Sequence, residues 1–155
     1  MQQEYNVVIA DTTCFILLDK IGKLELLQQL FFTITTTQTI ADEFGKPLPI
    51  WVNVVAPTDI HYQEILEVEV DAGKASAIAL SFEYEKPLLI LDDFKARKLA
   101  SKLNLLFTGT FGVFLKAKEV GVIDTVKSIL ELVQQTNFRF SETIVHNILR
   151  EAGEG

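Results

Sequence analysis

The strongest constraint on the fold is a series of short apolar runs that alternate with helical stripes. Residues 7–10, 88–91 and 105–107 are nearly continuous apolar segments, a pattern typical of strands buried on both faces of a parallel sheet. Between them, apolar residues of 75–82 and 96–103 recur at intervals of three and four, which is helical spacing. Parallel strands need crossover helices. The sequence therefore predicts an α/β protein, a three-layer α/β/α fold with a mainly parallel central sheet.

Weaker patterns complete the expected order of elements. Residues 32–34 are a candidate second strand, and residues 50–55 alternate weakly between flanking prolines, which favours a strand at the edge of the sheet. Beyond Gly121 we expect two more helices, with Asp124 and Ser141 as their N-caps. We divide the chain into an α/β domain, residues 1–120, and a C-terminal helical extension, residues 121–155, packed on that domain.

Composition excludes several classes of protein. Hydrophobic residues make up 48% of the chain, too many for an intrinsically disordered protein. A single cysteine excludes a disulfide framework and a thiolate metal cluster. The longest apolar runs are far shorter than the ~20 residues of a membrane span, and no secretory signal is visible. We therefore expect a cytoplasmic protein without a membrane partner.

The charge balance bears on nucleic-acid binding. Lys and Arg number 14 against 21 Asp and Glu, a formal net charge of −7. That acidity argues against a broad basic face for nucleic acid. A small cluster of carboxylates that binds a cation would still let phosphate approach through one narrow region.

Acidic residues follow two of the predicted strands. Asp11 ends the first strand, and Asp92 and Asp93 follow the strand over 88–91. Ligands of open parallel sheets bind at the carboxyl ends of the strands, so we expect these carboxylates to converge. Neighbouring carboxylates need a positive charge to remain ionised together, and Mg²⁺ or Mn²⁺ commonly supplies it. In the alternative interpretation each Asp only caps the helix that follows it.

Several segments, taken in order, resemble a known family. They are residues 8–13 (Val-Ile-Ala-Asp-Thr-Thr), 71–80 (Asp-Ala-Gly-Lys-Ala-Ser-Ala-Ile-Ala-Leu), 88–93, 108–113 (Thr-Gly-Thr-Phe-Gly-Val) and the tail from Phe138-Arg139-Phe140-Ser141. Together they resemble PIN-domain proteins, in particular the VapC-like branch of prokaryotic nucleases with a C-terminal helical extension. The resemblance covers nearly the whole chain.

The resemblance implies a metal-dependent (Mg²⁺ or Mn²⁺) endoribonuclease, the toxin type of a toxin–antitoxin pair. It implies RNA as substrate, an antitoxin protein as partner and a homodimer. Transferred by position, the metal-binding and catalytic candidates are Asp11, Glu43, Asp92 and Asp93, with Asp71 as a further metal ligand and Thr13 and Thr110 as hydroxyl groups beside the metal. Asp42 is an acidic neighbour of Glu43, but helical phase with Ile40 favours Glu43.

One position departs from the family pattern. The glutamate that usually follows the glycine of the third-helix segment is here Lys74. A lysine in the metal shell would repel a divalent ion or replace part of its charge. The alternative function is therefore a catalytically impaired PIN-fold protein that binds RNA or protein. A metal-dependent phosphatase is a third hypothesis, weakened because Thr13 stands where its usual second aspartate would be.

Other side chains have structural or binding interpretations. Cys14, Phe15 and Phe82 are expected in the core. Phe31 and Phe32 are candidates for either the core or a partner surface. The basic residues Lys95, Arg97, Lys98 and Lys102 form either an RNA-facing cluster or the solvated face of a helix.

Overall fold

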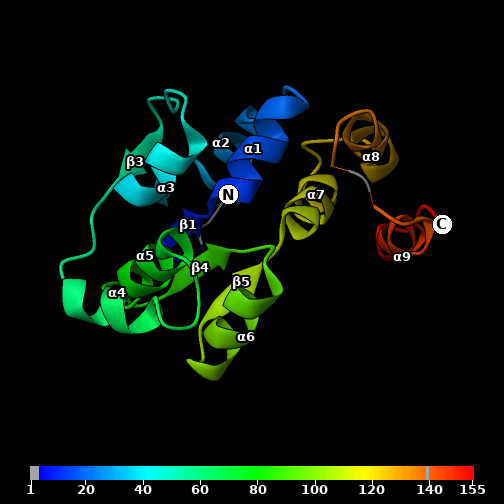
Figure 1. The fold of residues 1–155 in the computed structure, drawn as a ribbon. Coiled ribbons are helices and arrows are strands. Elements are labelled where there is room, and N and C mark those ends of the chain that lie inside the picture. Colours follow the sequence, from blue (N-terminus) through cyan, green and yellow to red (C-terminus); the bar gives the residue numbers. More distant parts are fainter. Residues whose placement is uncertain (1–3, 139) are drawn as a thin grey trace.

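Strands and helices alternate along almost the whole chain in the computed structural model, which describes residues 4–138 and 140–155 (Figure 1). The strands are β1 (Val7–Ala10), β2 (Ile34–Thr36), β3 (Val52–Val54), β4 (Pro87–Ile90) and β5 (Leu106–Thr108). The helices are α1 (Thr12–Lys20), α2 (Glu25–Phe31), α3 (Gln38–Phe44), α4 (Ile60–Leu66), α5 (Ala72–Ser81), α6 (Phe94–Lys102), α7 (Thr110–Glu119), α8 (Val126–Gln134) and α9 (Glu142–Glu151).

The five strands form one parallel sheet in the order β3-β2-β1-β4-β5. Helices α4, α5 and α6 lie to one side of the strands, and α1, α2 and α7 to the other (Figure 1). This arrangement confirms the predicted three-layer α/β/α fold, with β3 at an edge as expected. The strand order reverses between β1 and β4, and such a reversal is where open parallel sheets bind ligands.

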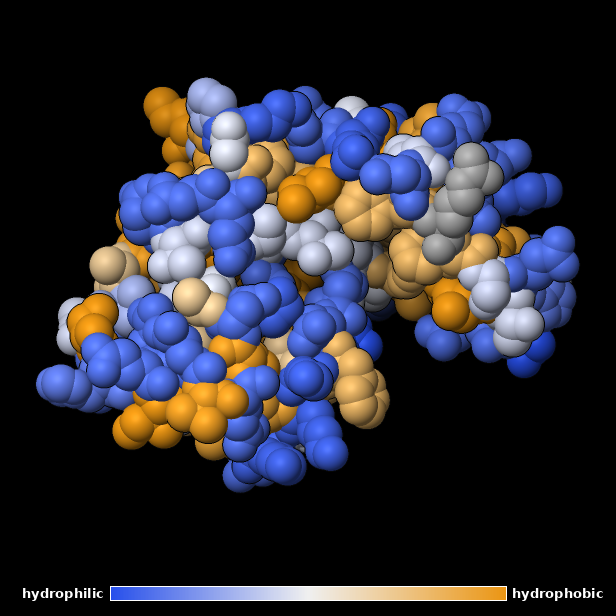
Figure 2. Space-filling model, in the orientation of Figure 1, coloured by the Kyte–Doolittle hydropathy of each residue, from blue (hydrophilic) through white to orange (hydrophobic). Residues whose placement is uncertain are grey.

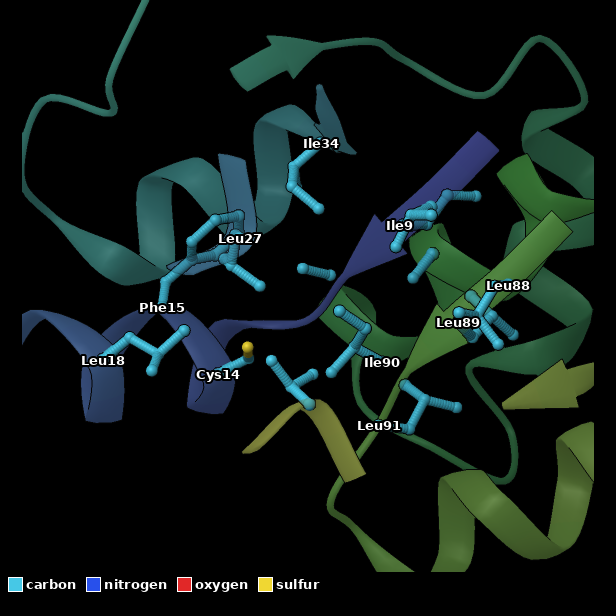
Figure 3. Packing of buried hydrophobic residues seen from close by; sticks show 14 of the residues in the cluster. Ile9, Cys14, Phe15, Leu18, Leu27, Ile34, Leu88, Leu89, Ile90 and Leu91 are labelled. Atoms are coloured by element: carbon cyan, nitrogen blue, oxygen red, sulfur yellow. The ribbon is translucent and has the colours of Figure 1, made fainter. Parts of the chain in front are cut away.

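The core forms where the apolar runs of β1 and β4 meet the helices. Ile9, Leu89 and Ile90 are completely buried, because helices cover both faces of the central strands. Figure 3 shows Cys14 of α1 on the side of the helix toward Ile90 and Phe15 beside Leu27 of α2, and both are completely buried as predicted.

Three local predictions are corrected. Strand β2 begins at Ile34 and not at Phe32, because Phe32 ends α2 with a φ of 66°, a conformation that cannot continue a strand. Phe82 is 45% exposed and packs edge-on against Tyr62 at a centroid distance of 5.3 Å, so it does not belong to the core. The N-cap of α8 is Thr125, whose hydroxyl accepts from the Ser128 N–H, and not the preceding aspartate.

The C-terminal helices are tied to α7 by one carboxylate. Helix α8 packs on α7, and α9 on α8, at the side of the molecule away from β3 (Figure 1). Glu154 accepts the N–H of Val126 at 2.7 Å and of Lys127 at 2.9 Å, so it caps α8 from beyond α9. It also accepts from the Lys118 ammonium at 2.9 Å. Ser141 caps α9 as predicted, whereas Arg139 lies outside the described residues.

The surface is mixed in character. Figure 2 shows apolar side chains gathered over the α4 region, where Ile60, Ile65 and Val68 are exposed. Within the described chain, no helix has both the length and the apolar character needed to cross a membrane.

Candidate functional site

Two acidic residues and a threonine lie at the carboxyl ends of three adjacent strands. Asp11 directly follows β1, Asp92 lies two residues beyond β4, and Thr110 lies two residues beyond β5. The parallel register aligns the last residues of these strands, and the Asp11 N–H donates to the Ile90 carbonyl at 3.2 Å. The side chains therefore share the edge of the sheet where the strand order reverses.

Asp11 is the most unusual group of this site. It is only 1% exposed, and among the described residues neither of its carboxylate oxygens has a hydrogen-bond partner. The Lys74 ammonium lies 3.5 Å from Asp11 Oδ2. Burial raises the pKa of the Asp11 carboxyl, and the charge of Lys74 opposes that rise. A buried carboxylate without hydrogen bonds requires a cation beside it.

Lys74 reaches Asp11 from the first turn of α5. Asp71 caps this helix by accepting the Lys74 N–H at 3.1 Å, and its other oxygen lies 3.1 Å from the Lys74 ammonium. Burial opposes the charged form of Lys74, but the charge of Asp11 and then the hydrogen bond to Asp71 raise its pKa above the ordinary value. The lysine is therefore a charged ammonium at neutral pH, and Asp71 serves both as the helix cap and as the second partner of that ion.

Asp92 is held by the start of α7. It accepts the Thr110 N–H at 2.8 Å on Oδ1 and the Thr110 hydroxyl at 2.6 Å on Oδ2. A Cβ at Gly109 would collide with the Arg97 guanidinium and come within 2.9 Å of Asp92 Oδ1. The glycine therefore lets the loop approach Asp92 closely enough for the Thr110 N–H to donate.

Glu43 reaches the site from α3 and is fixed by Thr12, a threonine that was not among the predicted site residues. The Thr12 hydroxyl donates to Glu43 Oε1 at 2.6 Å, so the structure brings Thr12, and not Thr13, against an acidic candidate. A Cβ at Gly73 would collide with the same Glu43 carboxylate, so this glycine makes room for it beside α5. Asp42 instead accepts from Gln38 at 2.8 Å, which agrees with the choice of Glu43 by helical phase.

Asp93 has the structural role of a helix cap. Its Oδ2 accepts the Ala96 N–H at 2.9 Å at the start of α6, the alternative that the sequence left open. Its charge still acts on Lys74. Asp93, Lys74 and Lys95 line one cavity of about 290 Å³ beside Asp71, so the ammonium of Lys74 has access to solvent.

Arg97 is a residue that the sequence placed incorrectly. The sequence predicts that Arg97 belongs to the basic cluster of α6 with Lys95, Lys98 and Lys102. In the structure its Nε donates to the Leu91 carbonyl at 2.6 Å, and its guanidinium lies over the Phe107 ring at 5.5 Å. Arg97 therefore holds the loop that carries Asp92. Helical spacing carries a signal for this, because position 97 lies three residues before the buried Ala100 and so shares its side of the helix.

The acidic groups at this edge of the sheet do not form a ready cage for a metal ion. Burial raises the pKa of the Cys14 thiol, and the charges of Asp92 and Asp11 both add to that rise. Across the residues that the structure describes, no three His, Cys, Asp or Glu side chains form a group suited to a metal ion. Mg²⁺ needs only one or two carboxylates when waters and substrate phosphates complete its shell. The bare oxygens of Asp11 therefore fit one such ion, with Asp92 or Glu43 as the second ligand.

Comparison with known proteins agrees with this architecture. The model of the family DUF3368, described as a PIN domain, matches residues 7–154, whereas no curated protein matches the chain. The match spans the sheet, the carboxylates at its edge and the C-terminal helices. The chain therefore belongs to the PIN-domain family, a family of nucleases.

Proposed function

We propose that this protein is an endoribonuclease that hydrolyses phosphodiester bonds with one Mg²⁺ or Mn²⁺ ion. The observation that carries the proposal is the buried Asp11 carboxylate, which has no hydrogen-bond partner among the described residues and lies at the reversal point of the sheet. Burying such a group is costly unless a cation meets it. The Lys74 ammonium does so 3.5 Å from Oδ2, and a metal ion would supply the hydrogen-bond-free carboxylate with direct coordination. Membership of a nuclease family supplies the reaction class.

Asp11, with Asp92 or Glu43 as the second ligand, would hold the cation. When bound, such an ion lowers the pKa of a coordinated water and offsets the negative charge that builds on the phosphoryl oxygens. The protein's own contribution is orientation. Thr110 fixes both oxygens of Asp92, and Thr12 fixes one oxygen of Glu43, so neither carboxylate has to be ordered when RNA arrives.

Helix α6 offers a surface for the RNA backbone. Lys95, Lys98 and Lys102 are exposed on this helix, which starts directly after Asp93. Lysine contacts to phosphate give affinity without sequence selection. Because the whole chain carries a net charge of −7, we expect weak RNA binding that depends on the divalent ion and falls with salt.

A toxin of a toxin–antitoxin pair, acting in the cytoplasm, is the biological setting we propose. Ile60, Ile65 and Val68 are exposed by 52%, 65% and 86%, and exposed apolar residues of this kind anchor protein partners. The α4 region is therefore our candidate surface for an antitoxin, with a second copy of the chain as the alternative occupant.

The decisive experiment is cleavage of a mixed-sequence RNA by purified protein in Mn²⁺, with product ends analysed. Wild type should cleave internally, and Asp11→Asn should lose at least about a hundredfold in rate, the scale of losing a group that stabilises transition-state charge. Asp42→Asn is the matched control, because Asp42 binds Gln38 on the same helix and should retain the activity. Equal rates for wild type and Asp11→Asn would refute the proposal.

A second candidate function is supported by the ion pair of Lys74. An ammonium already neutralises Asp11, and no ready three-ligand metal group is present in the described structure. Both facts suit a PIN-fold protein that binds RNA or protein without cleaving it. RNA binding that is identical with Mn²⁺ and with EDTA, without any cleavage, would favour this candidate over the nuclease.

A further inference from the structure

We infer that the Lys74 ammonium occupies the place of a second cation in this site, so that a built-in positive charge lowers the affinity of the carboxylates for divalent metal. The inference rests on the proposed function for its relevance to catalysis. Its physical content, a competition between an ammonium and a metal ion, can be measured without RNA.

The geometry of Lys74 carries the inference. Its ammonium lies 3.5 Å from Asp11 Oδ2 and 3.1 Å from Asp71 Oδ2, so it bridges two carboxylates from two different elements. The Lys74 side chain is only 16% exposed, and the Asp11 side chain only 2%. The partner Asp71 is 58% exposed, so the ammonium lies between one buried and one exposed carboxylate. A cation that bridges two carboxylates is the situation of a metal ion, and here a side chain provides it.

No other basic side chain takes this role. In the described part of the chain, Lys74 is the one cation within ion-pair distance of Asp11. Arg97 is nearby in sequence to Asp92, but its Nε is committed to the Leu91 carbonyl. Without Lys74, Asp11 would be a buried charge with no counter-ion, which is strongly unfavourable.

The start of α5 brings a further carboxylate close to the ion pair. Gly73, next to Lys74, lies against the Glu43 carboxylate, where a Cβ would collide. A metal ion at Asp11 Oδ2 would therefore have to displace the ammonium, because the two positive charges would repel one another in a region of low dielectric. The other oxygen, Asp11 Oδ1, has no hydrogen-bond partner among the described residues and is left for the single ion of the proposed reaction.

The test is calorimetric titration of Mn²⁺ alone into four proteins. They are the wild type, Lys74→Glu, Lys74→Met and Lys23→Glu. Lys74→Glu replaces the ammonium with a carboxylate, and Lys74→Met removes the charge while keeping the length of the side chain. Lys23→Glu is the matched control, because it makes the same charge change at an exposed lysine beyond the far end of α1.

We expect Lys74→Glu to bind Mn²⁺ at least about tenfold more tightly than wild type, because ligand charge count sets affinity in carboxylate sites. Lys74→Met should lie between them, and Lys23→Glu should match wild type. If Lys74→Glu does not fold, the gain in Lys74→Met decides the question, and Mn²⁺ should raise its melting temperature more than that of wild type.

Two results would overturn the inference. One is Mn²⁺ affinity in wild type equal to that of both Lys74 variants, and the other is an equal gain in Lys23→Glu, which would reveal a general charge effect. Failure of the nuclease proposal is distinguishable, because a wild type that never cleaves RNA can still show the gain of metal affinity in the Lys74 variants.

Discussion

Replacement of Lys74 by methionine should destabilise the protein through Asp11 and not through lost packing. Lys74 neutralises a carboxylate that is 1% exposed, and removing one partner of a buried pair typically costs ~3–5 kcal/mol. Lys74→Met is close in length to lysine, so its own packing loss should be small. We therefore expect most of the loss to disappear when Asp11 is also made neutral.

The size of the effect follows from the alternatives open to Asp11. The carboxyl can take a proton instead of staying charged. Its ordinary pKa is 3.8, and protonation at pH 7 costs about 1.36 kcal/mol for each pH unit above that pKa, or ~4 kcal/mol in all. Burial already raises the pKa of Asp11 in the wild type, so part of this cost is present before the mutation. We therefore expect a loss of about 3 kcal/mol in the free energy of unfolding.

Urea denaturation of a double-mutant cycle measures this effect. Asp11→Asn should cost about 1 kcal/mol, because Lys74 keeps Asp71 as a partner and a neutral amide needs no counter-ion. The double variant should be about as stable as Asp11→Asn, so the coupling energy should be about 2–3 kcal/mol. Additive losses, with coupling below ~0.5 kcal/mol, would refute the idea that Lys74 serves as the counter-ion of Asp11.

Three further predictions concern other groups of the structure. Thr110→Val removes the hydroxyl that donates to Asp92 at 2.6 Å. It should reduce the Mn²⁺-dependent cleavage rate about tenfold and lower the unfolding free energy by about 1 kcal/mol. An unchanged rate in a single-turnover assay would contradict the proposal that Thr110 orients Asp92. Gly73→Ala should stabilise α5 by up to ~1 kcal/mol through helix propensity and should push the Glu43 carboxylate away. The melting temperature should therefore rise while the RNA cleavage rate falls. A variant with a normal cleavage rate would contradict the need for Glu43 to lie against α5. Burial opposes the charge of Glu154, but hydrogen bonds from Lys118 and from the start of α8 outweigh it and lower the pKa below its ordinary value of 4.5. The stabilising contribution of Glu154 is therefore complete above pH 4.5 and is lost as the pH falls through the lowered pKa. Glu154→Gln should cost about 1 kcal/mol of unfolding free energy at pH 7 and should lose less stability than wild type between about pH 5 and pH 3.

The sequence predicted the fold well because the strongest signals are those of burial. The apolar runs at β1 and β4 are continuous since helices cover both faces of these strands, and such runs are hard to mistake. Phe32 and Phe82 were harder, because both are aromatic residues at the ends of helices. Whether such a residue turns inward depends on the backbone at the helix end, which apolar spacing does not reveal.

The candidate site was predictable in its residue types more than in its contacts. Asp11 and Asp92 could be placed at strand ends from the pattern alone, but the choice of Thr12 over Thr13 depends on which face of α1 meets α3. Lys74 was expected near the acidic groups through the family resemblance, but its partners are Asp11 and Asp71. Arg97 turns inward to the Leu91 carbonyl, whereas the usual interpretation of charge on an amphipathic helix is a solvated face.

The most direct test of the whole account is an anomalous-scattering map from crystals of wild type and of Lys74→Glu soaked in Mn²⁺. We predict one Mn²⁺ peak beside Asp11 and Asp92 in the variant, with a weaker peak in the same place in wild type and Lys74 still paired with Asp71. A strong peak at any other acidic cluster, with none beside Asp11 in either crystal, would contradict the account.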